Sequence, residues 1–376
     1  MIAFQSVFPP FRGGISRFSD HLYKNLSQSL PVRAFNYSKL YPPMLFPGKT
    51  QYLEDRSQTY ANPILHSYNP FQWGRTTDTM IHQDTLVYLY SHWHPFFAAS
   101  QISILKEIKT QYPDVVTASI IHNVLPHEKF PAQDILTRRL LKLTDHPIVL
   151  SEQTHQEYRT LMDGQNPERL FHPVYEQDWP LESRASIRER MGYAEDEIVV
   201  LFFGLVRPYK GLDVLVDALN LMNLENTRIR PLIVGEFYIE PQQITNRIKK
   251  SHLPYYEIIN RYVSDDEAAF YLAASDVMVL PYRSASQSGV LSNALNFNLP
   301  VVVSDLAGLT EHVKYGETGF IVTPENPVSL AKELLYVATQ ADLNKMRENV
   351  ELHRQQLSWK RFTKELINVV ELGDNT

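Results

Sequence analysis

Short apolar runs alternate with helix-period segments along most of this 376-residue sequence. In the second half, the runs have the length and the aliphatic composition of strands that are buried on both faces. Strands that alternate with helices imply a parallel sheet, because each crossover returns the chain to the same edge. The expected strands lie near residues 198–203, 229–234, 256–259, 276–280, 300–304 and 319–322.

The first half shows the same alternation with one interruption. Residues 39–82 are rich in Pro, Tyr, Asn and Ser and have weak periodicity, so an irregular segment is expected there. Such a segment either serves ligand recognition or is a plain surface excursion. The other elements expected in this half are strands at 2–8, 85–90, 115–121, 147–150 and in a run ending at 171–175, and helices near 15–26, 95–110, 134–143 and 151–162.

The length of the chain favours two domains of about 180 residues each over a single core. The polar stretch 176–183 contains Pro180 and precedes a fresh series of strands and helices, so it is the expected linker. The sequence therefore predicts an α/β protein with one domain at 1–175 and a second at 184–358.

Composition narrows the class of protein. Hydrophobic residues make up 44% and charged residues 21% of the chain, which is ordinary for a soluble globular protein. No run approaches the roughly 20 apolar residues of a membrane span, and the N-terminal MIAFQSVFPPF is not a signal peptide. Because there is no cysteine, disulfides and thiolate zinc sites are excluded, and a cytoplasmic location is the simplest expectation.

The formal net charge of −6 is unevenly distributed. Residues 1–175 hold 16 Lys and Arg against 14 Asp and Glu, together with 10 of the 13 histidines. A mildly basic first half suits an anionic membrane surface or a charged acceptor, so peripheral contact with the inner membrane surface is one expectation. The imbalance is too small to indicate nucleic acid binding.

Two cations mark the loop that follows the strand at 198–203. The strand ends at Gly204, and Arg207 and Lys210 come just before or within the first turn of an apolar helix. A helix N-terminus already presents partial positive charge and unpaired N–H groups, so cations there suggest that an anion, usually a phosphate, occupies the spot. The alternative is a pair of solvated surface cations.

A second candidate phosphate site follows the strand at 276–280. The run 284–289 consists of small and polar residues and leads into an apolar helix. Small side chains let a ligand approach the backbone, and the helix N-terminus offers N–H groups. Ser288, Gly289 and Val290 are therefore expected to contact a phosphate. A Ser-capped helix with a flexible entry is the alternative.

Other strand ends carry further candidates. The glycine turn Gly13 and Gly14 and the strand-end His122 lie where the carboxyl edge of a parallel sheet is expected, which is where open α/β folds bind ligands. The sequence H-W-H at 92–94 lacks a third ligand with suitable spacing, so aromatic lining is favoured over a metal site. The acidic run at 265–267 follows Ser264, which fits a capped helix better than a metal motif.

The motif G-x-x-R-P-x-K-G, formed by Gly204, Arg207, Pro208, Lys210 and Gly211, resembles the donor-phosphate motif of retaining glycosyltransferases of family 4. The resemblance covers almost the whole chain and is strongest from 198 to 324. It implies the GT-B fold, in which two Rossmann-like domains with parallel sheets face each other across a cleft. It also implies that a last helix, about 359–376, packs back on the first domain.

The resemblance assigns roles residue by residue. In that family the Arg and Lys hold the diphosphate of a nucleotide sugar, and the strand-end histidine lies beside the reacting sugar and acceptor. No metal and no cofactor are implied. The catalytic residues would be His122, Arg207 and Lys210; the donor-binding residues Gly13, Gly14, Arg207, Lys210, Gly235, Val263, Gln287, Ser288, Gly289, Val290 and Asn293; and the acceptor-binding residues His122, Asn123 and His127.

The sequence departs from the family pattern at two positions. The usual form has two glutamates eight positions apart, and here Ala285 and Asn293 occupy those positions. Asn293 can still hydrogen-bond a ribose hydroxyl, and Gln287 is a substitute for the sugar contact. The Q-S-G-V form of this loop resembles a variant found in bacterial polysaccharide-type transferases. We therefore expect that other residues replace the sugar and ribose contacts of the two glutamates, rather than that these contacts are lost.

The sequence thus predicts an enzyme that transfers a sugar, with retention of configuration, from a nucleotide diphosphate sugar to a glycan or lipid-linked hydroxyl in cell-surface polysaccharide synthesis. Two alternatives stay open. One is a sugar nucleotide epimerase of the same fold, and the missing carboxylates count against it. The other is a non-catalytic subunit that binds a nucleotide sugar.

Overall fold

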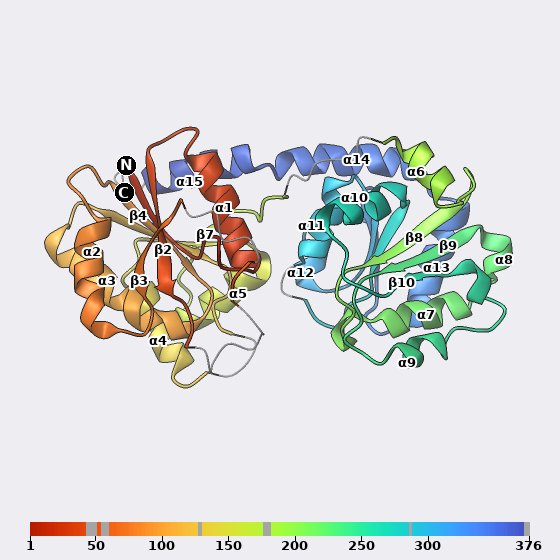
Figure 1. Cartoon of the computed structure of the whole chain (residues 1–376), viewed down its shortest axis with the longest axis horizontal. Helices are drawn as coiled ribbons and strands as arrows, with labels where there is room; N and C mark the ends of the chain where they lie inside the picture. The colour runs from red at the N-terminus through yellow and green to blue at the C-terminus, as the bar shows by residue number, and fades with distance from the viewer. Residues whose placement is uncertain (43–50, 54–59, 127–129, 176–181, 286–287, 372–376) are drawn as a thin grey trace. The chain divides into compact units, whose positions relative to one another are not determined.

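The computed structural model describes residues 1–42, 51–53, 60–126, 130–175, 182–285 and 288–371. The chain divides into two compact units. Unit 1 consists of residues 1–173 and 358–376, and unit 2 of residues 174–357. Each unit is built around one parallel sheet with helices on both faces (Figure 1). The predicted α/β class, with two Rossmann-like parallel sheets, is confirmed.

Unit 1 contains a seven-stranded sheet in the order β3-β2-β1-β4-β5-β6-β7. All its strand pairs are parallel. The central strands consist almost wholly of buried side chains, most of which are apolar. The strands are β1 (Ile2–Gln5), β2 (Val32–Lys39), β3 (Asn62–His66), β4 (Val87–His92), β5 (Val116–Ile121), β6 (His146–Val149) and β7 (Glu168–Arg169).

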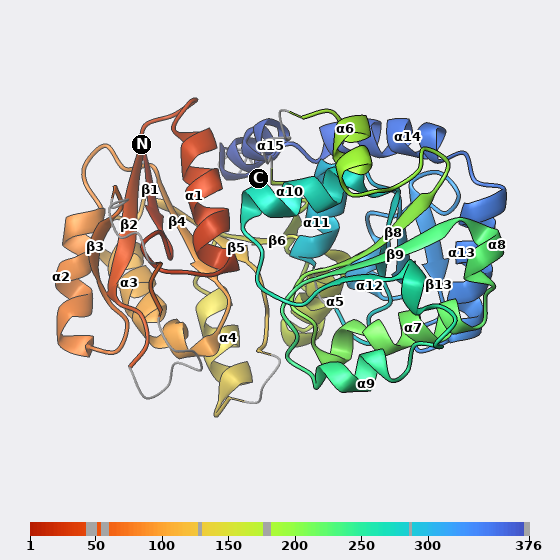
Figure 2. The same cartoon turned by 45° about the vertical axis from the view of Figure 1, so that its right-hand side comes forward.

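The helices of unit 1 cover both faces of this sheet. Helices α2, α3 and α4 pack side by side on one face, and α1 and α15 pack together on the other (Figure 2). Phe18 of α1 contacts Trp359 and Phe362 of α15, with ring centroids 5.1 and 5.9 Å apart. The helices are α1 (Gly14–Leu26), α2 (Pro70–Met80), α3 (Ala98–Gln111), α4 (Gln133–Leu141), α5 (Glu152–Leu161) and α15 (Trp359–Glu371), and a 3₁₀ turn at Pro95–Phe97 precedes α3.

Unit 2 contains a six-stranded sheet in the order β10-β9-β8-β11-β12-β13, again with only parallel pairs. Its strands agree with the predicted ranges to within about one residue at each end. They are β8 (Ile198–Phe203), β9 (Ile229–Val234), β10 (Glu257–Ile259), β11 (Val277–Leu280), β12 (Val301–Ser304) and β13 (Gly319–Val322).

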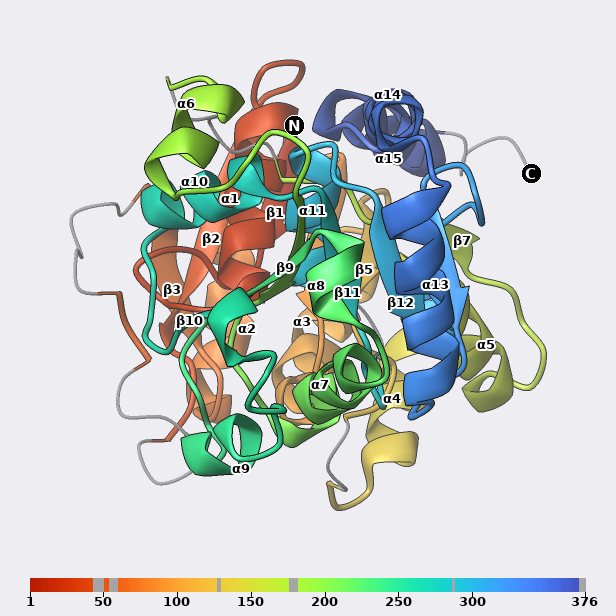
Figure 3. The ribbon, with the colours of Figure 1, turned by 90° about the vertical axis from the view of Figure 1, so that its right-hand side faces the viewer.

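Two apolar layers hold the helices of unit 2 against its sheet. One layer joins the sheet to α7 and α13, which lie side by side (Figure 3), and the other joins it to α6, α10 and α11. Bounds are α6 (Arg184–Arg190), α7 (Leu212–Asn220), α8 (Leu224–Thr227), α9 (Pro241–Thr245), α10 (Asp265–Ala274), α11 (Gly289–Asn296), α12 (Ala307–Thr310), α13 (Pro327–Thr339) and α14 (Leu343–Gln356), with 3₁₀ turns at Pro208–Lys210 and Leu253–Tyr255.

The prediction for residues 39–82 was wrong over its second part, where β3 and α2 form. Strand β3 is at the sheet edge, where Pro63 is tolerated because no further strand needs its N–H. Helix α2 buries Thr76, Thr77 and Met80, so its inward face reads as polar in the sequence. The strand β3 and the helix α2 were therefore not recognisable from the sequence of this segment.

The strand expected to end at 171–175 was also misplaced. The last strand of unit 1 is the two-residue β7, and residues 170–175 that follow it have no strand pairing. The two residues of β7, Glu168 and Arg169, are exposed at the sheet edge. The strand therefore leaves no apolar run in the sequence. In the described part of the chain, no helix combines the length and the apolar character needed to cross a bilayer.

Candidate functional site

The order of strands in unit 2 creates a crevice beside β8. The chain passes from β8 to β9 and β10 on one side, then returns to β11 on the other side of β8. Loops that leave the carboxyl ends of two such strands diverge, and ligands bind in the space between them. The loop with Arg207 and Lys210 follows β8, and the segment 281–285, which leads toward α11, follows β11. Both predicted phosphate segments therefore meet at this switch point.

Gly204 is the place where these two loops come into contact. Its φ is +97°, and a Cβ atom there would lie 3.1 Å from Nζ of Lys210 and 3.2 Å from Cγ2 of Val290. The Lys210 ammonium and the first turn of α11 thus lie against the same piece of backbone. A substituted side chain at 204 would displace one of them, which is why this turn requires glycine.

Lys210 is buried without a counter-ion. Its side chain is only 7% exposed, and Nζ lies 5.7 Å from the centre of the Tyr282 ring. None of the described carboxylates forms an ion pair with it. Burial, with a smaller contribution from the Arg207 charge, lowers the pKa of Lys210 to about 8. A buried and unpaired cation is costly, so the site suits an anionic ligand that would complete the pair.

Arg207 differs from Lys210 because it is exposed. Its guanidinium lies 5.1 Å from the ring centre of Tyr238, which follows β9. Stacking of this kind keeps a cation in place without neutralising it. Of the two predicted cations, Lys210 is therefore buried, and Arg207 lies at the surface against Tyr238.

Backbone contacts fix the geometry of the three loops. Gly211 adopts φ +69°, and a Cβ there would lie only 2.0 Å from the carbonyl oxygen of Pro281. A Cβ on Gly235 would lie 2.1 Å from the carbonyl oxygen of Gly204. The loops after β8, β9 and β11 therefore approach backbone to backbone, and only glycine permits this.

Helix α11 begins at the second predicted phosphate site. The Ser288 hydroxyl accepts a hydrogen bond from the backbone N–H of Leu291 at 3.2 Å, which is an ordinary N-cap. The N–H groups of Gly289 and Val290, in the first turn of α11, donate no backbone hydrogen bond to another described residue. Gln287, which we expected to contact the sugar, lies outside the described residues.

A cavity of about 150 Å³ opens beside this crevice. Three predicted donor-binding residues line it, namely Gly235, Val263 and Asn293. Tyr262, which is 71% exposed, lines it too and was not predicted, because a single exposed tyrosine in a loop gives no local signal. The remaining lining residues are Phe203, Gly204, Leu205, Glu236 and Ala268.

The acidic run after Val263 is structural. Ser264 accepts a hydrogen bond from the backbone N–H of Glu267 at 3.3 Å, so it caps α10. Glu267 also forms a two-pronged ion pair with Arg261. The prediction that Ser264 caps the helix at this run is confirmed.

Unit 1 has its own switch point, between β1 and β4. Gly13 has φ +123° and Gly14 opens α1, and both are exposed with no atom near the position of a Cβ. The turn thus presents open backbone at the carboxyl end of β1. This placement is what a ligand-facing glycine turn needs, since only a small residue leaves the helix N-terminus uncovered.

His122 lies directly after β5 and is 7% exposed. Its ring packs edge-on against Phe18 at 4.8 Å, and Nε2 is buried with no hydrogen-bond partner among the described residues. Burial, followed by the nearby His172 and His92, lowers the pKa of His122 to about 3. The imidazole of His122 is therefore neutral near pH 7.

The structure describes only one of the two other predicted acceptor-binding residues. Asn123 is partly buried beside His122, whereas His127 lies outside the described residues. The Nδ1 atom of His94 accepts a hydrogen bond from the backbone N–H of Phe96 at 3.1 Å, so it caps the 3₁₀ turn. No group of three or more His, Asp or Glu side chains suited to a metal ion occurs in the part of the chain that the structure describes.

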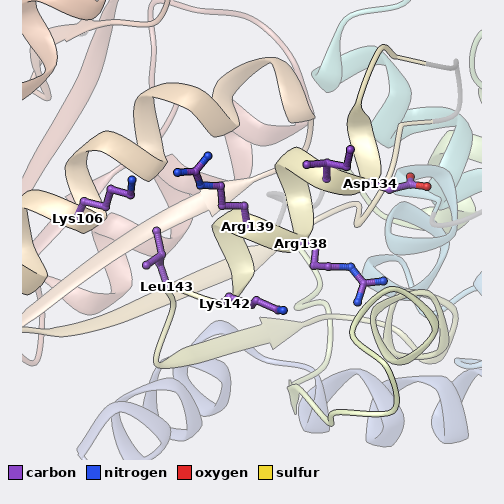
Figure 4. A pocket seen from close by; sticks show the side chains of 7 residues that line it. Lys106, Asp134, Arg138, Arg139, Lys142 and Leu143 are labelled. Carbon is purple, nitrogen blue, oxygen red and sulfur yellow. The ribbon is translucent and has the colours of Figure 1, made fainter.

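A basic groove of about 570 Å³ lies between α3 and α4 of unit 1. Figure 4 shows Arg138, Arg139 and Lys142 projecting from α4 and Lys106 from α3. Arg138 pairs with Asp163, whereas the other three cations form no ion pair with a described residue. Ile135, which is 71% exposed, adds an apolar edge to this groove.

These observations define the class of protein as an α/β protein with two Rossmann-like units and a candidate phosphate site at a strand-order switch point in unit 2. Residues 197–340 match the family model for glycosyl transferases group 1. The match lies within unit 2 and includes the G-x-x-R-P-x-K-G motif at 204–211.

Curated relatives agree with this family. A D-inositol 3-phosphate glycosyltransferase of Streptomyces bingchenggensis is 26% identical over 211 residues, which cover 53% of this chain and 46% of that protein. An uncharacterized glycosyltransferase of Methanocaldococcus jannaschii is 28% identical over 162 residues, which cover 43% of this chain and 44% of that protein. The chain thus matches less than half of the length of these relatives.

Solved structures extend the likeness to the whole fold. HepE of Anabaena, solved in complex with UDP, superposes with a TM-score of 0.70 at 15% identity and covers 98% of this chain and 99% of its own. A glycosyltransferase of Rickettsia africae superposes with a TM-score of 0.72 at 15% identity and covers 100% of this chain and 98% of its own. The predicted GT-B fold is confirmed by these neighbours.

Proposed function

We propose that the protein is a retaining glycosyltransferase that moves a sugar from a nucleotide diphosphate sugar to a glycan or lipid-linked hydroxyl in cell-surface polysaccharide synthesis. The observation that carries the proposal is the buried Lys210, which has no counter-ion among the described residues and lies against Gly204 beside the N-terminus of α11. HepE, which shares the fold, has been solved with UDP and with UDP-glucose, and this supports a nucleotide-sugar donor.

In the proposed reaction, the bond between the anomeric carbon and the phosphate oxygen loosens, and negative charge accumulates on the leaving diphosphate. Lys210, Arg207 and the N–H groups of Gly289 and Val290 in the first turn of α11 would stabilise that charge. Charges and dipoles that are already in place are effective because they need no reorganisation as the bond breaks. The acceptor hydroxyl would attack from the leaving-group side and pass its proton to the donor phosphate.

The remaining assignments complete the proposal. Gly235, Val263 and Asn293 would hold the nucleoside in the cavity of unit 2, with Asn293 bonding a ribose hydroxyl. Gly13 and Gly14 would face the donor phosphates, and Gln287 the sugar. His122, Asn123 and His127 would contact the acceptor, and the neutral His122 would orient a hydroxyl without ionising it. Because the cations already neutralise the diphosphate, we propose that no metal or cofactor is required.

A ligand panel tests the proposal. Thermal shifts with nucleoside diphosphates and their sugar derivatives would identify the base, and slow release of the nucleoside diphosphate from the matching donor would report activity without an acceptor. Conversion of the donor into an isomer would indicate an epimerase. Binding with neither transfer nor hydrolysis would indicate a non-catalytic subunit, and the absence of any shift would contradict a nucleotide-sugar site.

The pKa of Lys210 predicts how binding depends on pH. Because the free ammonium titrates near pH 8 and a bound diphosphate raises its pKa, binding above pH 8 must take up a proton. Affinity for a nucleoside diphosphate should therefore be constant from about pH 7 to 7.5 and fall by up to about tenfold per unit above pH 8. Calorimetry in two buffers of different ionisation enthalpy measures this uptake. A flat affinity up to pH 9.5 would contradict the predicted proton uptake.

We further propose that unit 1 makes peripheral contact with the anionic cytoplasmic face of a membrane through the groove between α3 and α4. Lys106, Arg139 and Lys142, which form no ion pair with a described residue, and the exposed Ile135 combine charge with an apolar edge. Each cation near an anionic surface is worth about 1 kcal/mol. Replacing both Arg139 and Lys142 with Glu should therefore weaken binding to vesicles that contain phosphatidylglycerol by at least about tenfold.

Co-sedimentation with vesicles measures this effect. Vesicles of phosphatidylcholine alone should not bind the wild-type protein. The matched control is the double replacement of Lys360 and Lys364 with Glu, which reverses two exposed charges on α15 of the same unit. An equal loss in the control would mean that net charge alone matters, and the groove would then have no special role.

A further inference from the structure

Arg283 connects the two loops of the candidate phosphate site. It follows β11, and its backbone N–H donates to the carbonyl oxygen of Tyr209 at 2.7 Å. Its Nη1 atom donates to the carbonyl oxygen of Pro208 at 2.5 Å. Both acceptors belong to the 3₁₀ turn that carries Lys210. One residue of the β11 loop therefore holds two consecutive carbonyl groups of the β8 loop.

The guanidinium of Arg283 is itself held by two carboxylates. Asp213, in the first turn of α7, accepts from Nη1 at 3.0 Å and from Nη2 at 2.7 Å, and Glu325 accepts from Nε at 2.7 Å. Burial raises the pKa of Asp213, but the bonds from Arg283 outweigh it and lower that pKa below its ordinary value. A planar guanidinium suits this fork, whereas a lysine ammonium could not reach all these acceptors in one geometry.

Lys210 depends on its own backbone for its position. No ion pair with a described carboxylate directs its ammonium, and the buried charge would favour a move toward water. What holds it is the turn at Pro208–Lys210, which is fixed by Gly211 against Pro281 and by the bonds from Arg283. Release of those bonds would let the turn open and the ammonium become hydrated.

We propose that Arg283 is a positioning residue for diphosphate binding, which holds the Pro208–Lys210 turn so that the Lys210 ammonium stays beside Gly204. The inference rests on the proposed function, because it gives Lys210 the role of binding the diphosphate. Arg283 would not touch the ligand. Its effect would pass through the turn and through the ionisation of Lys210.

Inorganic pyrophosphate is a suitable probe because its binding needs no particular base. In Arg283→Gln, affinity measured by calorimetry should fall by about tenfold, which corresponds to about 1.4 kcal/mol. In Asp213→Asn, the bond to Pro208 is retained and the fall should be about threefold. Arg283→Lys should behave like Arg283→Gln, because the position needs the fork rather than the charge.

A second readout separates positioning from a general loss of stability. The pH at which pyrophosphate affinity begins to fall should move from about 8 toward the ordinary lysine range in Arg283→Gln, since a hydrated Lys210 regains a higher pKa. Arg247→Gln is the matched control. It removes the ion pair between Arg247 and Asp217 near the other end of α7, and it should leave both affinity and pH midpoint unchanged.

The outcomes distinguish the two proposals. In one outcome, the wild-type protein binds pyrophosphate and UDP, and Arg283→Gln and Asp213→Asn bind pyrophosphate with an affinity within about twofold of the wild-type value and with the same pH midpoint. The positioning role is then overturned, while the proposed function stands. If the wild-type protein binds neither pyrophosphate nor any nucleoside diphosphate, both are overturned. Should Arg283→Gln not fold, Asp213→Asn and Arg283→Lys decide the question.

Discussion

Replacing Lys210 with Ala is expected to lower sugar transfer by at least about tenfold, because it removes the cation that lies deepest in the site proposed for the leaving diphosphate. Affinity for a nucleoside diphosphate should fall with it, whereas affinity for the nucleoside should not. Initial rates at saturating and at low donor concentration would divide the loss between kcat and KM. Near-normal turnover would contradict the mechanism.

The thermal stability of a second variant, Lys210→Met, distinguishes a loss of function from a loss of folding. A buried cation without a partner costs free energy, so Lys210→Met should unfold at the same temperature as the ligand-free wild-type protein or at a higher one. Loss of activity together with unchanged or raised Tm would place the effect on function. Lys345→Ala, which changes an exposed lysine in the same unit, serves as the control and should leave activity unchanged.

Replacing Gly211 with Ala is expected to destabilise unit 2 by at least about 3 kcal/mol. Two effects combine there. A left-handed conformation costs a non-glycine residue about 1–2 kcal/mol, and the new methyl group would meet the carbonyl oxygen of Pro281 at 2.0 Å. Because that oxygen belongs to the backbone of the β11 loop, relief of the clash must push the two phosphate loops apart.

Gly192→Ala separates these two effects. Gly192 is in the same unit and has a similar φ of +76°, but no atom lies within 4 Å of the position of its Cβ. It should therefore cost only the conformational part, about 1–2 kcal/mol. Urea unfolding of both variants measures the difference. Equal losses of stability would show that the contact with Pro281 has little energetic effect.

The predictions from sequence were most accurate where one physical rule determined both the pattern and the structure. Strands buried on both faces leave uninterrupted apolar runs, so the strands of unit 2 were located closely. Because parallel strands end at one edge, Lys210, Gly289 and Asn293 were expected close to one another, and the structure places all three within unit 2 around the end of β8.

Features that depend on distant contacts were not predictable from local pattern. Arg283 bonds to Pro208 and Glu325, which are 75 and 42 residues away in the sequence, and nothing beside it marks this role. The burial of Lys210 was missed for the same reason, since a lysine after a proline and a tyrosine reads as exposed. Helix α2 was missed because its inward face consists partly of threonine.

The return of α15 to the first unit has a consequence during synthesis on the ribosome. Phe18 is made early, yet its partners Trp359 and Phe362 emerge only after the whole of unit 2 has been translated. Until then, Phe18 on α1 lacks these aromatic partners, and its exposed ring can promote aggregation or chaperone binding. We infer that the first 173 residues of the nascent chain lack their last helix while the 184 residues of unit 2 are being synthesised.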